Sequence, residues 1–248
     1  MVPQYEILVE GSSVAFQGGF FGISTIVLIR SGATLALFDC GHGVTRKLLL
    51  DALQHRGLAP KDIDLVILSH GHFDHVLNLD LFPEVPVVLS RDEYDYIQAP
   101  FESDWVTPRL LPMLLEGREL RLTAGEEEIL PGVTAFPTPG HAPGHISLEL
   151  PSPEGPVVLA ADALKTAREA STGIPDLEFD PETRQEIATG RPASRPHHRS
   201  RPFPDDPDGR GRQDLMDRHS GDAIAVPVRE GSMDDLVQTS GRRPASCP

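Results

Sequence analysis

The residues best suited to chemistry follow one short apolar run near residue 70. The run is Leu65-Val66-Ile67-Leu68, and it continues directly into Ser69-His70-Gly71-His72-Phe73-Asp74-His75. Imidazole and carboxylate groups together are ligands for zinc, and also for iron or manganese. His70 and His72 are two positions apart, so in an extended chain their side chains point the same way and can hold one ion. Gly71 lets the loop fold back, so Asp74 and His75 can face a second ion beside the first.

A buried strand must position this loop. Four consecutive apolar residues at 65–68 predict such a strand, and α/β folds usually place their chemistry at the carboxyl ends of strands. Two further predicted strands also end in polar groups: 133–137 runs into Thr138-Pro139-Gly140-His141-Ala142-Pro143-Gly144-His145, and 157–161 ends at Asp162. Glycine and proline predict a tight loop around His141. The agreement between these strand ends argues against a solvated, histidine-rich loop.

The two motifs, HxHxDH at 70–75 and TPGHxxGH at 138–145, resemble those of the metallo-β-lactamase-fold hydrolases. That group includes the glyoxalase II thioesterases, the N-acyl-homoserine lactonases and small metallo-β-lactamase domain-containing proteins. The resemblance covers roughly residues 5–188. It implies an α/β fold, a four-layer αβ/βα sandwich, which here would lack its final strand and helix. We therefore expect a hydrolase domain at 1–188 and a separate segment at 189–248.

The resemblance also implies a role for individual residues. Metal ligands are expected at His70, His72, Asp74, His75, His141 and Asp162. Asp162 would bridge two zinc ions, with iron or manganese as alternatives, and Asp74 would be catalytic by orienting a hydroxide and accepting a proton. Asp39, at the end of another predicted strand, and His145 would support the ligands through hydrogen bonds. A helix cap is the alternative role for Asp39.

The resemblance also implies a seventh ligand, a histidine in a Pro-Gly-His type loop after the bridging aspartate. This chain has no such loop in the expected context. Residues 189–248 contain ten arginines, eight prolines and only about 15% Leu, Ile, Val, Phe and Met, which is too little for a packed core. Two explanations stay open: a natural disordered tail or, as we favour, a reading-frame change near residue 189. With no credible seventh ligand, we expect the second metal position to be weaker than the first.

Composition bounds the partners and the location. The formal net charge is −15, which argues against a nucleic-acid partner because an acidic surface repels phosphate. Cys40 and Cys247 are the two cysteines, too few for a disulfide framework, so a cytoplasmic protein is expected. The N-terminus lacks the pattern of a secretory signal, and the apolar stretch at 19–29 is too short to span a bilayer. We expect a small-molecule substrate and no membrane, while the oligomeric state is not indicated.

The chemistry implied by the resemblance is hydrolysis of an ester, lactone or thioester by a hydroxide held between two metal ions. Lactonases carry a tyrosine shortly after the bridging aspartate, where this chain has Ala163-Leu164-Lys165. This difference argues against a lactonase. Lys165 could instead bind a substrate carboxylate. Two alternatives are a phosphodiesterase or ribonuclease of the same fold, and an inactive remnant that lacks the seventh ligand.

Three further elements are predicted around these residues. A helix at 44–55 would place its apolar face on Val44, Leu48, Leu49, Ala52 and Leu53. A short helix is expected at 76–82, after the HxHxDH motif. Residues 98–117 are expected to form a loop-rich, lid-like insertion.

Limited proteolysis tests the predicted tail. Its apolar content cannot offset the entropy of ordering the chain, about 1–2 kcal/mol per residue for the backbone alone. Cleavage is therefore expected first after arginines between Arg191 and Arg212, with the sites identified by mass spectrometry. A tail that resists protease as long as the body does would show that it is folded.

Overall fold

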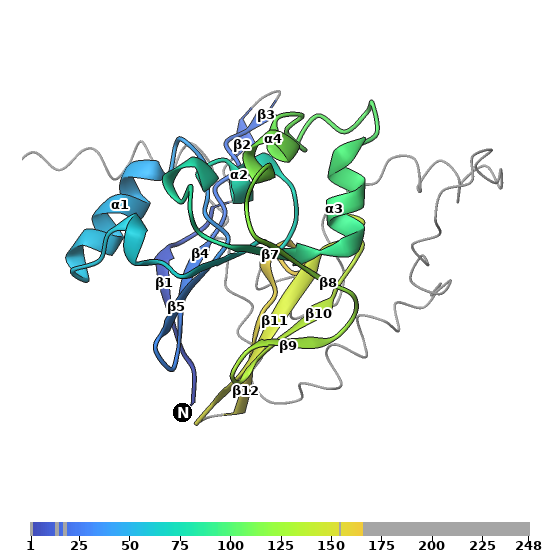
Figure 1. The fold of residues 1–248 in the computed structure, drawn as a ribbon. Helices are drawn as coiled ribbons and strands as arrows, with labels where there is room; N and C mark the ends of the chain where they lie inside the picture. Colours follow the sequence, from blue (N-terminus) through green and yellow to red (C-terminus); the bar gives the residue numbers. More distant parts are fainter. Residues whose placement is uncertain (1, 13–14, 17–18, 154, 166–248) are drawn as a thin grey trace, which may run out of the picture.

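The computed structural model describes residues 2–12, 15–16, 19–153 and 155–165, and all elements named below lie in these ranges (Figure 1). The predictions for the segment 189–248, for the boundary at residue 188 and for the missing final strand and helix lie outside the described residues. Within those ranges, no helix is both long enough and apolar enough to cross a membrane.

The first sheet has six strands and carries the site at one edge. Their order is β1 (Gln4–Val9), β4 (Ile26–Ser31), β5 (Thr34–Phe38), β6 (Leu65–Ile67), β7 (Val87–Ser90) and β8 (Leu120–Thr123). The strands β1, β4 and β5 pair antiparallel, whereas β5 to β8 pair parallel. The carboxyl ends of β5, β6 and β7 therefore meet at the same edge.

The second sheet has four antiparallel strands. Their order is β12 (Gly155–Leu159), β11 (Ile146–Ser152), β10 (Val133–Pro137) and β9 (Glu127–Leu130). A separate two-stranded sheet pairs β2 (Ala15–Phe16) with β3 (Gly19–Phe20). Figure 1 shows the second sheet beside the strands of the first, with the helices gathered away from it.

Four α-helices and three 3-10 turns complete the described part. They are α1 (Arg46–His55), α2 (Phe73–Val76), α3 (Arg91–Gln98), α4 (Leu111–Leu115), η1 (Pro60–Asp62), η2 (Leu79–Leu81) and η3 (Ala161–Ala163). The helix α3 begins directly after β7, where the Ser90 hydroxyl accepts a hydrogen bond from the backbone N–H of Glu93. This serine N-cap stabilises the helix start.

The alternation of side chains along β4 separates two cores. Ile26 and Leu28 pack with the helices on one face, whereas Val27 and Ile29 pack against the second sheet. Strands show this period of two because successive side chains point to opposite faces. The arrangement of helices, first sheet and second sheet confirms the predicted α/β class, and a helical layer beyond the second sheet would lie outside the described residues.

The predicted apolar face of α1 was wrong at two positions. Leu49, Ala52 and Leu53 are buried, but Val44 is 58% and Leu48 is 55% exposed. Val44 precedes the helix, which begins at Arg46. Leu48 lies about 100° around the helix from Leu49, beyond the stripe that the first sheet covers.

The short helix predicted at 76–82 was also placed too late. The chain forms α2 from Phe73 to Val76, and then η2. The helix begins early because His72 has an extended conformation, φ −69° and ψ 150°, and serves as its N-cap residue. Asp74 and His75 therefore lie on a helical turn instead of a loop.

Replacing Leu49 or Leu48 by alanine tests the observed face of α1. Leu49→Ala should lower the free energy of unfolding by about 2–5 kcal/mol, because the fully buried side chain would leave a cavity. Leu48→Ala is the matched control on the same helix and should change it by less than about 0.5 kcal/mol. Urea denaturation measures both, and equal losses would contradict the assignment of the face.

Candidate metal centre

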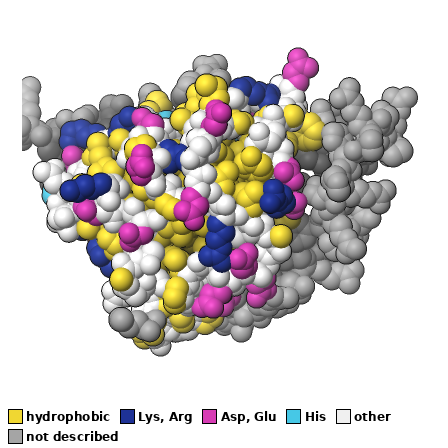
Figure 2. All heavy atoms as spheres, in the orientation of Figure 1, with side chains coloured by type: hydrophobic (Ala, Val, Ile, Leu, Met, Phe, Trp, Pro, Cys, Tyr) yellow, Lys and Arg dark blue, Asp and Glu magenta, His cyan; other side chains and the backbone are white. Residues whose placement is uncertain are grey.

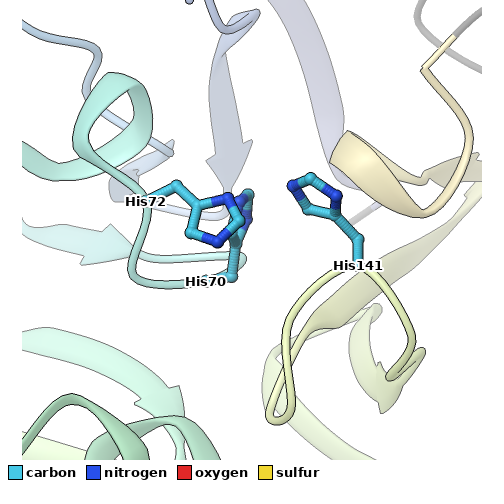
Figure 3. A group of neighbouring side chains, drawn as sticks. All are labelled: His70, His72 and His141. Carbon is cyan, nitrogen blue, oxygen red and sulfur yellow. The ribbon is translucent and has the colours of Figure 1, made fainter. Parts of the chain in front are cut away.

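Two loops from different sheets bring three histidines together. His70 and His72 follow β6, and His141 follows β10 from the opposite side (Figure 3). Their ring centroids are 4.4 Å (His70 to His72), 4.9 Å (His70 to His141) and 4.6 Å (His72 to His141) apart. One ring nitrogen of each lies within 4.8 Å of the other two. Figure 3 shows the rings turned toward a common space.

A second group shares His70 and adds His75 and Asp162, again with all ligand atoms within 4.8 Å. Asp162 lies between two imidazoles: its Oδ1 is 3.4 Å from Nε2 of His75, and its Oδ2 is 3.1 Å from Nε2 of His141. Asp74 belongs to neither group, although its Oδ2 lies 3.7 Å from Nε2 of His75. Lys165, three residues after Asp162, is the last described residue and is partly buried.

The buried carboxylate of Asp39 holds His75 and Ser69 in place through hydrogen bonds. Its Oδ2 accepts hydrogen bonds from Nδ1 of His75 at 2.7 Å and from Oγ of Ser69 at 2.8 Å. Its Oδ1 accepts one from the backbone N–H of Ser69 at 2.8 Å. The residue before α1 is Thr45, so Asp39 does not cap that helix.

Asp39 also has an unusual backbone conformation. Its φ is 60°, in the left-handed region that non-glycine residues rarely adopt. Such a conformation costs on the order of 1–3 kcal/mol and persists only where surrounding contacts hold it. Ala161, directly before Asp162, has a φ of 43°. Asp39 and Asp162 thus both depend on backbone turns that the rest of the fold maintains.

Hydrogen bonding indicates which nitrogen of His70 faces the centre. Ser69 donates its hydroxyl proton to Asp39, so its oxygen accepts a hydrogen bond from Nδ1 of His70 at 2.9 Å. The Nε2 atom of His70 then carries a lone pair. Within the described part of the chain this buried Nε2 has no hydrogen-bond partner. A buried imidazole lone pair beside two further histidines fits a divalent cation such as zinc.

The local charges divide the histidines into two kinds. Burial, reinforced by the neighbouring imidazoles, lowers the pKa of His70 and of His72 well below the usual value, so both are neutral near pH 7. Burial alone would also lower the pKa of His75. The negative charges of Asp39, Asp74 and Asp162 outweigh it and raise that pKa well above the usual value.

The two carboxylates at the centre also differ. Burial, with the nearby charge of Asp162, raises the pKa of Asp74. Burial would raise the pKa of Asp162 too, but the facing histidines, His141 first and then His75, hold it well below its usual value. Asp162 is therefore the more strongly ionised of the two.

His145 lies beside the centre and is fully buried. Its Nδ1 is 2.8 Å from the hydroxyl of Thr138, which is in turn 2.8 Å from the hydroxyl of Ser147. Its ring centroid lies 5.0 Å from that of His70. His145 belongs to neither group of three potential ligands. It lies next to His70 but is not one of the clustered ligand residues.

Sequence reasoning missed two residues of this region, Ser69 and Glu93. Ser69 directly precedes the HxHxDH motif, and a hydroxyl at that position was an available signal. Ser90 and Glu93 form an S-x-x-E pattern, which predicts a helix start. It does not predict that the Glu93 carboxylate accepts hydrogen bonds from the backbone N–H groups of Gly71 and Gly144, at 2.7 and 2.8 Å.

Known proteins resemble the chain in sequence and in fold. The profile of the metallo-beta-lactamase superfamily matches residues 19–205. Metallo-beta-lactamase domain-containing protein 1 of Xenopus laevis is 32% identical over 184 residues, 73% of this chain and 71% of that protein. An N-acyl homoserine lactonase of Bacillus thuringiensis is 33% identical over 135 residues, 54% of this chain and 52% of the lactonase. The chain thus spans about half the length of the lactonases that it matches.

A solved structure supports the fold. The 1.4 Å structure of an N-acyl homoserine lactone hydrolase, with the product N-hexanoyl-L-homoserine at its catalytic metal centre, superposes with a TM-score of 0.62. The superposition covers 97% of this chain and 96% of that one, at 19% sequence identity. At this identity the likeness concerns the fold.

Asp39→Ala tests, in the metal-free protein, the hydrogen bonds that Asp39 accepts from His75 and Ser69. The change leaves three buried donors without their acceptor, so the metal-free protein should lose about 2–5 kcal/mol of unfolding free energy. Asp64→Ala is the matched control, since the exposed Asp64 carboxylate also accepts a backbone N–H, that of Leu35, at 2.8 Å. The control should lose less than about 1 kcal/mol. Denaturation in the presence of a chelator measures both, and similar losses would contradict the role given to Asp39.

Proposed function

Because the chain belongs to the metallo-beta-lactamase superfamily, we propose that it is a metal-dependent hydrolase of a small ester, lactone or thioester. A lactone is the first candidate because relatives of the chain are named as lactonases, although the chain lacks the tyrosine expected after the bridging aspartate. The observation that carries this proposal is the meeting of three histidines from two sheets. Ring nitrogens of His70, His72 and His141 lie within 4.8 Å of one another, and burial keeps His70 and His72 neutral.

The proposed ligands form two groups. His70, His72 and His141 would hold one divalent ion, and His75 with Asp162 and Asp74 would hold a second. Zinc is our proposal, and iron or manganese could use the same atoms. When bound, such ions polarise a carbonyl group and make water a stronger acid. A seventh ligand would lie outside the described residues, and we propose that the second position is the weaker one.

Two carboxylates would organise the reaction. Asp162 directs one oxygen toward His75 and the other toward His141, so it would fix the separation of the two ligand groups. Asp74 lies 3.7 Å from Nε2 of His75 and keeps 15% of its side chain exposed. In that position Asp74 would orient a water molecule and accept its proton. His145 would support the His141 loop through its contact with Thr138.

Exposed apolar side chains on one segment suit an acyl chain. The segment between α3 and β8 exposes Trp105, Leu110 and Met113, at 68%, 46% and 74%. It is joined to α2 by a hydrogen bond from the backbone N–H of Phe73 to the carbonyl of Val106 at 2.9 Å. Relatives of the chain are named for N-acyl homoserine lactones, which combine an acyl chain with a lactone ring. We propose that this segment contacts the apolar part of the substrate.

Lys165 is the proposed contact for a negatively charged group. It follows Asp162 by three residues, and we propose that its ammonium group binds a carboxylate. Hydrolysis of a lactone or a thioester releases a carboxylate. A lysine in this place therefore suits the product of either substrate.

A phosphodiesterase or ribonuclease is the alternative of the same fold. Residues 1–188 contain 28 acidic and 12 basic residues. On the face that Figure 2 shows, Lys and Arg side chains are scattered among Asp and Glu. Such a surface does not favour a polyanionic substrate. An inactive remnant is the remaining alternative, and metal content together with turnover distinguishes it.

The extent of the hydrolase domain is also a proposal. We keep its end at residue 188, where the composition changes to an arginine- and proline-rich segment. The superfamily profile continues to match as far as residue 205.

His72→Ala tests the proposed function directly. It should reduce bound zinc, measured by atomic absorption, and lower the rate of N-acyl homoserine lactone opening by at least about 100-fold, since even the loss of a supporting hydrogen bond costs 10- to 100-fold. His55→Ala is the control, because His55 is an exposed histidine at the end of α1. It should leave both quantities unchanged.

The substrate panel decides between the candidates. It comprises a lactone, a thioester, a simple ester and a phosphodiester, each assayed with zinc and with manganese. Turnover of the phosphodiester alone would replace the proposed class by the alternative. Unchanged zinc in His72→Ala would contradict the proposed ligands, and full zinc without turnover of any substrate would favour the inactive remnant.

A further inference from the structure

One buried side chain touches both histidine loops. Glu93 lies on α3 and is 1% exposed. Its Oε1 accepts a hydrogen bond from the backbone N–H of Gly71 at 2.7 Å, between His70 and His72. Its Oε2 accepts one from the backbone N–H of Gly144 at 2.8 Å, three residues after His141. A single carboxylate thus joins the loop of the first sheet to the loop of the second.

The chain approaches Glu93 so closely that both positions require glycine. A Cβ on Gly71 would lie 2.7 Å from Cγ2 of Ile97 and 3.0 Å from Oε1 of Glu93. A Cβ on Gly144 would overlap the backbone of Glu93. The Ser90 hydroxyl reinforces the second approach, since it donates to the carbonyl of Gly144 at 2.5 Å. Each loop therefore lies against α3, and a backbone N–H group of each loop donates a hydrogen bond to Glu93.

A helix cap does not account for this arrangement. In a capping box the glutamate would turn back to the N-cap residue, whereas both oxygens of Glu93 are directed to other segments. Burying a carboxylate is costly, and burial raises the pKa of Glu93 to about 7 although the two N–H donors act in the opposite direction. An apolar side chain would avoid that cost but would leave two buried N–H groups without acceptors.

We propose that Glu93 is a positioning residue that sets the separation of the two histidine loops, so that His141 meets His70 and His72 at one metal position. The inference rests on the proposed function for its effect on metal binding. The joining of the two loops by Glu93 does not depend on the proposed function.

The test compares Glu93→Gln with two controls in the full-length protein. Glutamine has almost the same shape but offers one acceptor oxygen, so one of the two N–H groups would face an amide NH₂. Asp92→Asn removes an exposed carboxylate from the same helix turn. Leu53→Ala, on the buried face of α1, provides a protein that is destabilised away from the loops.

Two readouts are measured. Zinc affinity, by competition with a chelator, should fall about 10- to 100-fold in Glu93→Gln, and the visible absorption spectrum of the cobalt(II)-loaded protein should change. Amide hydrogen exchange of the metal-free protein should become on the order of 10-fold faster in peptides that contain Gly71 and Gly144. Neither control should show these effects, although Leu53→Ala lowers the melting temperature.

The outcomes separate the inference from the proposed function. Unchanged exchange in both loops would overturn the inference whatever the metal result. Faster exchange with unchanged zinc affinity and cobalt spectrum would also overturn it, because the loops would then be joined without setting the metal position. If the unmutated protein binds no metal, the proposed function fails, and the exchange data alone decide whether Glu93 holds the loops. Effects of the same size in Leu53→Ala would reduce Glu93 to a general contributor to stability.

Discussion

The two sheets pack face to face through apolar side chains, and this packing determines where their strands end relative to one another. Ile29 and Phe38 of the first sheet share a core with Ala135, Leu148 and other residues of the second. The histidines of the first loop follow β6, and His141 follows β10. Because close-packed interiors deform little, the apolar core between the sheets holds the ends of β6 and β10 near one another, and polar contacts then position the loops that follow these strands.

Polar groups buried at that edge must then be satisfied individually. Ser69 connects Asp39 to the ring of His70, and its own carbonyl accepts the backbone N–H of Ile146 at 2.9 Å. Glu93 pairs with the peptide groups of Gly71 and Gly144. These bonds hold the two loops and orient the ring of His70, which is the preorganisation that the proposed metal site would require. Nε2 of His70, which has no hydrogen-bond partner within the described residues, is the atom that we propose as a metal ligand.

Much of the fold could be predicted from local patterns, and the remainder depended on tertiary contacts. The apolar run at 65–68 predicted β6, and the glycine- and proline-rich loop predicted the turn around His141. The early start of α2 was missed because it depends on the extended conformation of His72. The exposure of Leu48 was missed because periodicity does not indicate how wide a stripe the sheet covers. Glu93 is far from both loops in sequence, and no local pattern reports a carboxylate that joins them.

We propose that one metal position lies between His70, His72 and His141. The most direct measurement is a crystal structure of the zinc-loaded protein with anomalous diffraction data collected on both sides of the zinc absorption edge. We expect a strong anomalous peak among these three rings, about 2.0–2.1 Å from one nitrogen of each, and a weaker peak near His75 and Asp162. A structure whose only zinc peaks lie away from these histidines would contradict it.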